Sequence, residues 1–142
     1  MSGILFDEIV FGPVKSRRFG VSLGINLLPL QTKICTFDCI YCECGLTENK
    51  KQEKPHFFTE AEIKNSLENR FEALVQGGLK PDTITFAGNG EPTLHPDFSA
   101  IIDNTLALRN QYFPGAKITV LSNATRLHNP KVHEALLKID NN

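Results

Sequence analysis

The spacing of apolar side chains along the chain changes between a two-residue period and a helical period. Residues 21–28 alternate apolar and polar side chains and are followed by Pro29, which predicts a strand. Residues 59–76 instead place their apolar side chains on one face of a helix: Ile63, Leu67, Phe71, Leu74 and Val75. Thr59 and Glu62 form a capping-box sequence at the start of this helix.

The same order of elements occurs twice more. A β-branched strand is predicted at residues 83–87, ahead of a helix that starts near Pro96. Another strand is predicted at residues 117–121, and Asn129-Pro130 is a typical helix start. Such alternation favours parallel strands joined by helical crossovers, so we predict an α/β fold with a parallel sheet and helices outside it.

The length of 142 residues is typical of one domain. We predict that residues 21–142 form three β/α units and that residues 1–20 are an N-terminal extension. Within this extension, residues 4–10 are apolar enough for a short strand, which Gly12-Pro13 would break.

Three polar segments directly follow the three main predicted strands. They are a cysteine loop at residues 35–44, a glycine-rich turn at residues 88–91, and the pair Ser122-Asn123. Because ligands bind beyond the carboxyl ends of parallel strands, we expect these segments to meet at one rim of the sheet.

Charge and hydropathy exclude several classes of protein. The net charge is −1, so no general attraction to nucleic acid or membranes is expected. No segment approaches the roughly 20 apolar residues that span a bilayer. The first residues lack the basic stretch of a signal peptide. We therefore expect a cytoplasmic protein, in which clustered cysteines are more often ligands or redox groups than disulfides.

Cys35, Cys39 and Cys42 carry the candidate chemistry. Thiolates are soft ligands, and three of them can hold three corners of an iron–sulfur cubane while one iron stays open. The alternative is a structural, non-enzymatic zinc site that also uses Cys44. Cys42 and Cys44 are only two residues apart, which is an awkward grip on a tetrahedral ion, and we expect Cys44 not to be a ligand.

This cysteine spacing, with Tyr41 before the third cysteine, resembles the signature of the radical S-adenosylmethionine (radical SAM) superfamily. The resemblance implies that Cys35, Cys39 and Cys42 hold a [4Fe–4S] cluster, whose open iron is chelated by the amino and carboxylate groups of SAM. An electron from the reduced cluster would then break a C–S bond and yield a 5′-deoxyadenosyl radical. Tyr41 would lie near the SAM adenine; its alternative role is to pack the loop down.

Gly88, Asn89, Gly90 and Glu91 resemble the Gly-Gly-Glu motif of this superfamily, which binds the amino group of SAM. Asn89 stands where the family often has glycine, and asparagine also tolerates left-handed backbone. The alternative is an ordinary strand-to-helix turn.

Ser122 and Asn123 correspond in position to family residues that contact SAM, although Ala124 replaces the glycine that often follows. Here the alternative is a polar strand end. The basic run at residues 15–18 either meets an anionic group or is a solvated patch.

Residues 12–18, 22–26 and 33–35 are similar to one branch of the superfamily, the Fe–S oxidoreductases related to enzymes that form the wyosine base of tRNA. The resemblance implies SAM as a partner, flavodoxin or ferredoxin as electron donor, and tRNA as one candidate substrate. A different function within the superfamily is activation of a protein, as glycyl-radical activating enzymes perform.

The family core is a partial barrel of six β/α units, whereas three are predicted here. The chain therefore resembles an amino-terminal half, and we expect no turnover from it alone. Its last strand would have an unpaired edge, through which copies of the chain could self-associate.

Overall fold

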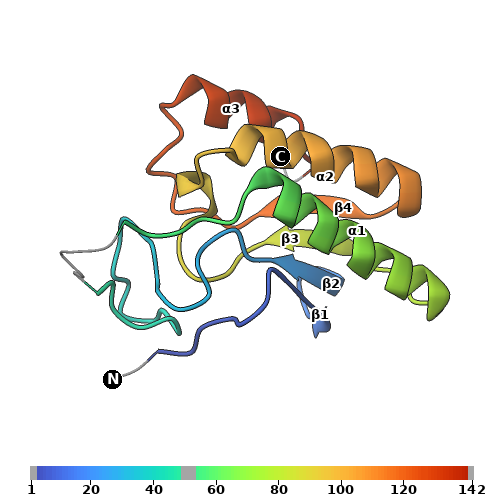
Figure 1. Ribbon diagram of the computed structural model, residues 1–142, viewed down its shortest axis with the longest axis horizontal. Helices are drawn as coiled ribbons and strands as arrows, with labels where there is room; N and C mark the ends of the chain where they lie inside the picture. Colours follow the sequence, from blue (N-terminus) through green and yellow to red (C-terminus); the bar gives the residue numbers. More distant parts are fainter. Residues whose placement is uncertain (1–2, 49–53, 141–142) are drawn as a thin grey trace.

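The computed structural model describes residues 3–48 and 54–140. Four strands form one sheet in the order of the sequence (Figure 1): β1 (Val10–Ser16), β2 (Gly20–Ile25), β3 (Thr83–Phe86) and β4 (Lys117–Val120). Strands β2, β3 and β4 are parallel, whereas β1 pairs antiparallel with β2. The predicted parallel sheet is confirmed, with β1 added at one edge.

A helix follows each parallel strand, and the three helices lie on one side of the sheet (Figure 1): α1 (Glu60–Gln76), α2 (Phe98–Tyr112) and α3 (Pro130–Leu137). A short 3-10 helix, η1 (Pro92–Leu94), lies between β3 and α2. The described residues therefore contain three consecutive β/α units, which confirms the predicted α/β class and agrees with part of a β/α barrel.

The two faces of the sheet differ in chemistry because side chains alternate along a strand. Apolar side chains of the strands join those of the helices in the core. Phe86 of β3 contacts Phe98 of α2 edge to face, with ring centroids 6.4 Å apart. The opposite face carries hydroxyl groups, and Ser22 Oγ lies 2.8 Å from Thr85 Oγ1 across β2 and β3. Burial of the first face holds the helices against the sheet.

The first helix begins as its sequence predicts. The Thr59 side chain accepts a hydrogen bond from the Glu62 N–H, and the Glu62 carboxylate accepts one from the Thr59 N–H. Val75 differs from the prediction, because it is 52% exposed near the end of α1. The second helix begins at Phe98, two residues after the predicted start.

The strand predicted at residues 4–10 is wrong. The strand lies at Val10–Ser16, and Gly12-Pro13 falls inside it at a register shift between Phe11 and Val14. An edge strand tolerates proline at such a bulge, because no inner ladder bond is lost. The segment before β1 instead runs beside the cysteine loop, where the Ile4 N–H donates to the Glu43 carbonyl at 2.7 Å.

Strand β2 ends at Ile25, before the predicted end at residue 28. The next residue is Asn26, which is fully buried. Its side chain takes the backbone groups of Leu28 that a neighbouring strand would otherwise bond. Its amide donates to the Leu28 carbonyl at 3.0 Å and accepts from the Leu28 N–H at 3.2 Å. The chain therefore turns at this point toward the cysteine loop.

Strand β4 lies at the edge of the sheet, and within residues 3–48 and 54–140 only β3 pairs with it. Directly after this strand, the Leu121 N–H donates to the Phe86 carbonyl of β3 at 3.0 Å. The Ile118 N–H is bonded instead to the Asp140 carboxylate at 3.1 Å, and Asp140 is paired with Arg109 at 2.8 Å. The predicted edge is present, while self-association through it stays a prediction.

None of the helices in the described part of the chain combines the length and apolar character needed to cross a membrane.

Candidate functional site

The cysteine loop and the glycine-rich turn are joined by their backbones. Ile34 forms a parallel bridge with Gly90. The Ile34 N–H donates to the Asn89 carbonyl at 2.9 Å, and the Glu91 N–H donates to the Ile34 carbonyl at 3.0 Å. Since Ile34 directly precedes Cys35, the start of the cysteine loop is fixed to the turn after β3.

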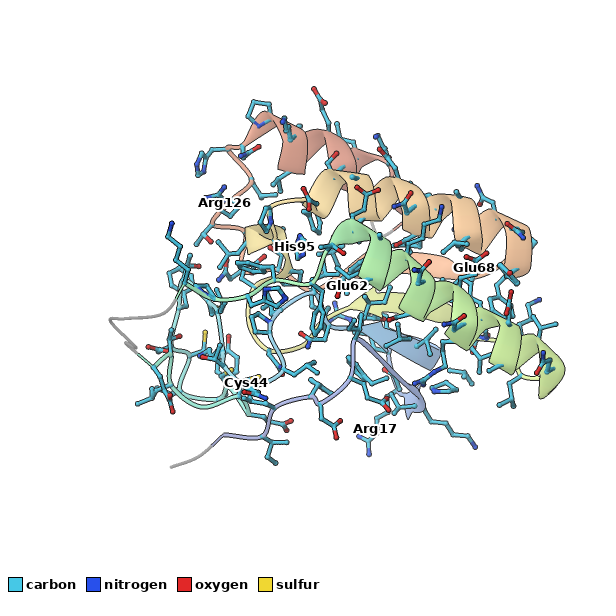
Figure 2. The ribbon with its side chains drawn as sticks, viewed as in Figure 1. Arg17, Cys44, Glu62, Glu68, His95 and Arg126 are labelled. Atoms are coloured by element: carbon cyan, nitrogen blue, oxygen red, sulfur yellow. The ribbon has the colours of Figure 1, made fainter. Side chains whose placement is uncertain are left out.

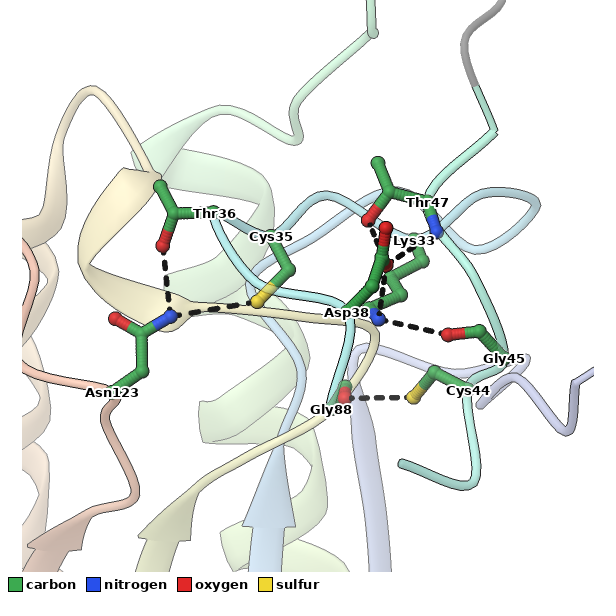
Figure 3. Close-up of polar contacts among 9 residues, drawn as sticks. All are labelled: Lys33, Cys35, Thr36, Asp38, Cys44, Gly45, Thr47, Gly88 and Asn123. Atoms are coloured by element: carbon green, nitrogen blue, oxygen red, sulfur yellow. Dashed lines mark hydrogen bonds and ion pairs between the residues drawn. The ribbon is translucent and has the colours of Figure 1, made fainter. Parts of the chain in front are cut away.

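The segment after β4 contacts the same loop through side chains (Figure 3). Asn123 Nδ2 donates to Thr36 Oγ1 at 2.8 Å and lies 3.6 Å from Cys35 Sγ, within hydrogen-bond range of sulfur. Thr36 Oγ1 also lies 2.9 Å from Thr125 Oγ1. The three segments that the sequence places after three strands therefore meet at one rim.

The two glycines of the turn allow close packing of backbone against neighbouring segments. Gly88 and Gly90 have φ values of 150° and 134°. A Cβ on Gly90 would overlap the carbonyl group of Ile34, and one on Gly88 would overlap the Asn26 side chain. Gly90 is therefore required for the junction with the cysteine loop, and Gly88 for the packing of the turn against Asn26, whether or not a ligand approaches them.

Asn89 does not use left-handed backbone, contrary to our interpretation of this position. Within the described residues, positive φ at a non-glycine occurs at Ala124, with φ 66°. The Asn89 side chain is buried, donates to the carbonyls of Phe6 and Pro29 at 2.9 and 3.0 Å, and accepts from the Phe6 N–H at 2.8 Å. Asparagine therefore fixes the N-terminal segment against the turn, and its side chain is already used within the protein.

Glu91 connects the turn after β3 to the segment after β4. Its carboxylate is 2% exposed and accepts hydrogen bonds from Thr93, Ser122 and Asn123. Oε1 takes the Thr93 hydroxyl, the Thr93 N–H and the Ser122 hydroxyl at 2.7, 3.3 and 2.7 Å. Oε2 takes the Asn123 N–H at 2.7 Å. A carboxylate has about four acceptor positions, and Oε2 is the less used of the two oxygens.

The cysteines are free thiols on a loop of turns, each partly buried. Tyr41 is 84% exposed, so its ring does not pack the loop down. A hydrogen bond with Cys39, together with the negative charge of Cys39, raises the pKa of Tyr41. The phenol therefore lies beside a candidate ligand with its ring accessible.

In residues 3–48 and 54–140, no three histidine, cysteine or acidic side chains converge in a geometry that would hold a metal ion. The donor set nevertheless fits an iron–sulfur cluster in its chemistry. Cys35, Cys39 and Cys42 are soft donors without disulfide partners, on one short loop whose start is anchored at Ile34. Rotation of cysteine side chains about Cα–Cβ bonds requires no change in that anchor.

The side chain of Cys44 reaches the turn after β3 (Figure 3). Its Sγ donates to the Gly88 carbonyl at 3.4 Å. Burial, followed by the charge of Cys42 and a hydrogen bond with it, raises the pKa of Cys44 to about 11. The Cys44 thiol thus has a partner in the turn after β3, and that Cys44 is not a ligand stays a prediction.

The sequence analysis did not identify Lys33, a buried lysine just before the cysteine loop. Lys33 is 4% exposed, and its ammonium donates to Asp38 Oδ1 at 3.0 Å and to the Gly45 carbonyl at 2.8 Å. Asp38 Oδ1 also accepts from the N–H and hydroxyl of Thr47 at 2.7 and 2.9 Å. The available signal was the order Lys33-Ile34-Cys35, which places a lysine beside an apolar residue and a cysteine. A lysine that is buried with such neighbours needs a partner of opposite charge.

His95, also missed, fixes the approach to α1 against the start of α2 (Figure 2). Its Nδ1 accepts from the Asp97 N–H at 3.0 Å, which leaves Nε2 protonated to donate to the Phe58 carbonyl at 2.8 Å. Burial lowers the pKa of His95 from its ordinary value of 6.5, against smaller opposing effects from the Phe58 carbonyl and Asp97. The neutral ring is therefore the form that the fold requires.

We predict that the free energy of unfolding falls as the pH drops below 6.5, the ordinary pKa of histidine. The folded-state pKa is lower, so the unfolded chain binds the proton first and protonation favours unfolding. The contribution is complete above pH 6.5 and is lost as the pH falls toward the folded-state pKa. Urea unfolding between about pH 5 and pH 8 measures this slope, and His95→Gln should flatten it. Equal slopes for the two proteins would contradict the role of His95.

Comparison with known proteins agrees with this arrangement of a cysteine loop and two rim segments on a β/α core. The family model of the radical SAM superfamily matches residues 30–142. The chain belongs to the radical SAM superfamily.

Three curated relatives illustrate the similarity. The chain is 38% identical over 132 residues to a UPF0026 protein of Helicobacter pylori, covering 93% of this chain and 40% of that protein. It is also 38% identical to a UPF0026 protein of Methanocaldococcus jannaschii, covering 93% and 38%. An S-adenosylmethionine-dependent nucleotide dehydratase of Selenomonas ruminantium is 32% identical over 101 residues, covering 71% and 30%. The chain thus spans well under half the length of these relatives. No solved structure matches it with significant similarity.

Proposed function

We propose that this chain provides the cofactor-binding part of a radical SAM enzyme. Cys35, Cys39 and Cys42 would ligate three irons of a [4Fe–4S] cluster, and SAM would bind at the fourth iron. The observation that carries the proposal is the rim junction, in which Ile34 is bonded to the glycine-rich turn while Cys35 and Thr36 contact Asn123.

Different residues of the rim would bind different parts of SAM. When bound and reduced, the cluster supplies the electron that cleaves the C–S bond of SAM to give a 5′-deoxyadenosyl radical. Gly88 and Gly90 would let the backbone approach SAM closely, and Glu91 Oε2 would accept from the SAM ammonium. Asn89 would fix the shape of this turn, because its backbone N–H and carbonyl are bonded to Asn26 and Ile34. Ser122 and Asn123 would also contact SAM, and Tyr41 would contact its adenine. The protein thus positions the cofactors and tunes them, while the cofactors perform the chemistry.

The substrate and the electron donor belong to the whole protein. The likeness to wyosine-forming enzymes supports a tRNA base as the substrate, and the nucleotide dehydratase among the relatives supports nucleotide chemistry. A protein substrate is the alternative. Flavodoxin or ferredoxin would supply the electron.

Anaerobic reconstitution with iron and sulfide tests the cluster. We expect about four irons per chain, with the absorption and EPR spectra of a cubane cluster. Cys35→Ala, Cys39→Ala and Cys42→Ala should each lose most of this iron, because each removes one ligand. Cys44→Ala is the matched control on the same loop and should retain it.

The zinc alternative gives a different result in the same experiment. A structural zinc module would bind one zinc without sulfide, and Cys44→Ala would weaken that binding as much as the other three substitutions. A full complement of iron in Cys35→Ala would also contradict the proposed ligand set.

A further inference from the structure

The cysteine loop encloses one buried positive charge, the ammonium of Lys33 (Figure 3). The side chain of Lys33 is 2% exposed, whereas that of its partner Asp38 is 43% exposed. A buried ammonium is costly unless it is paired and hydrogen-bonded, and here the Asp38 carboxylate and the Gly45 carbonyl supply both requirements. An apolar side chain at this position would avoid the cost of burying a charge, yet the protein has a lysine here.

The contacts of this ammonium join the two flanks of the cysteine loop to its middle. Lys33 lies two residues before Cys35, Asp38 lies directly before Cys39, and Gly45 follows the last cysteine. Asp38 also accepts both donors of Thr47, which draws the end of the loop to the same carboxylate oxygen. The pair therefore closes the loop around the candidate ligands before any cofactor binds.

The charge of Lys33 is held beside the candidate ligands, because Lys33 lies two residues before Cys35 and its partner Asp38 directly precedes Cys39. The ammonium donates to the Asp38 carboxylate at 3.0 Å and to the Gly45 carbonyl at 2.8 Å, and both contacts favour the charged form of lysine. Lys33 is therefore positively charged at neutral pH. Because Asp38 is more exposed, solvent screens its negative charge more than it screens the positive charge of Lys33.

We propose that Lys33 is a positioning residue that also raises the reduction potential of the cluster held by Cys35, Cys39 and Cys42. The inference rests on the proposed function. One-electron reduction makes the cluster one unit more negative, so a fixed positive charge nearby stabilises the reduced form more than the oxidised form. The electron comes from a low-potential one-electron donor, and no bond in the protein is made or broken.

Redox titration of the full chain, reconstituted without air and followed by EPR with dithionite as reductant, tests the proposal. Lys33→Met keeps the length of the side chain and removes its charge, so the midpoint potential should become more negative. We expect about a tenfold change in the reduction equilibrium, equal to about 59 mV for one electron. Asp38→Asn removes the opposing charge and should move the potential in the positive direction.

Both variants break the same ion pair, so a structural effect should shift the midpoint potential in the same direction in both. An effect of charge should shift it in opposite directions. Shifts in the same direction, or an unchanged potential in Lys33→Met, would overturn the inference. If Lys33→Met holds no cluster, Asp38→Asn decides alone: a positive shift supports the inference and any other result overturns it. Lys131→Met, an exposed site on α3, is the control and should leave the potential unchanged. A wild-type chain without a cluster would overturn the proposed function itself, whereas a wild-type cluster with unshifted variants overturns only the role of Lys33.

Discussion

Gly90→Ala is expected to destabilise the chain by about 3 kcal/mol or more and to detach the start of the cysteine loop. The added Cβ would overlap the Ile34 carbonyl, and the φ of 134° is strained for any residue with a side chain. Relief requires Ile34 to move away from the turn, which would displace Cys35. We therefore expect loss of both unfolding free energy and reconstituted iron, measured by urea unfolding of the metal-free chain and by iron analysis.

Gly78→Ala provides the matched control for this prediction. Gly78 also has positive φ, at 66°, but no atom lies within 4 Å of an added Cβ. Left-handed strain alone should lower the free energy of unfolding by about 1–2 kcal/mol, and iron content should not change. If the two variants behave alike, the junction between Gly90 and Ile34 does not have the importance assigned to it.

Glu91→Ala should lower the free energy of unfolding by about 3 kcal/mol, because buried donors lose their acceptor. The carboxylate accepts from Thr93, Ser122 and Asn123, and these partners belong to two different rim segments. The expected loss is therefore present without SAM or iron. Denaturant unfolding of the metal-free chain measures it, with Glu134→Gln on the exposed face of α3 as a control that should change stability by no more than about 0.5 kcal/mol.

Glu91→Gln separates the structural role of this residue from its proposed contact with SAM. The glutamine oxygen can keep the bonds to Thr93 and Ser122, but its NH2 group would face the Asn123 N–H, so a loss of about 1–2 kcal/mol is expected. A metal-free Glu91→Ala chain as stable as wild type would show that these hydrogen bonds contribute little.

The sequence predicted those parts of the fold that depend on neighbouring residues or on the order of the elements. The capping box at Thr59 and Glu62 needs only two side chains at the right spacing, and it is present. The meeting of three rim segments follows from strand order alone, because parallel strands end on the same side. The ligand set itself stays a prediction, because its support is a spacing and a family.

Long-range contacts explain what the sequence did not show. The apolar residues 4–10 suggested a strand, yet their partners are the cysteine loop and Asn89, which lie far along the chain. Glu91 was interpreted as a ligand for SAM, and its bonds to Ser122 and Asn123 depend on how β3 and β4 align. The environment of Lys33 likewise depends on the closure of a loop.

The Asp140 carboxylate has a consequence for how the sheet can be extended. A strand that docks beside β4 must compete for the Ile118 N–H, which Asp140 already occupies while paired with Arg109. Extension on that side is therefore an exchange reaction, in which one acceptor leaves as another arrives. A chance encounter between two copies offers little to drive that exchange, whereas a strand with its own apolar side chains to bury can drive it.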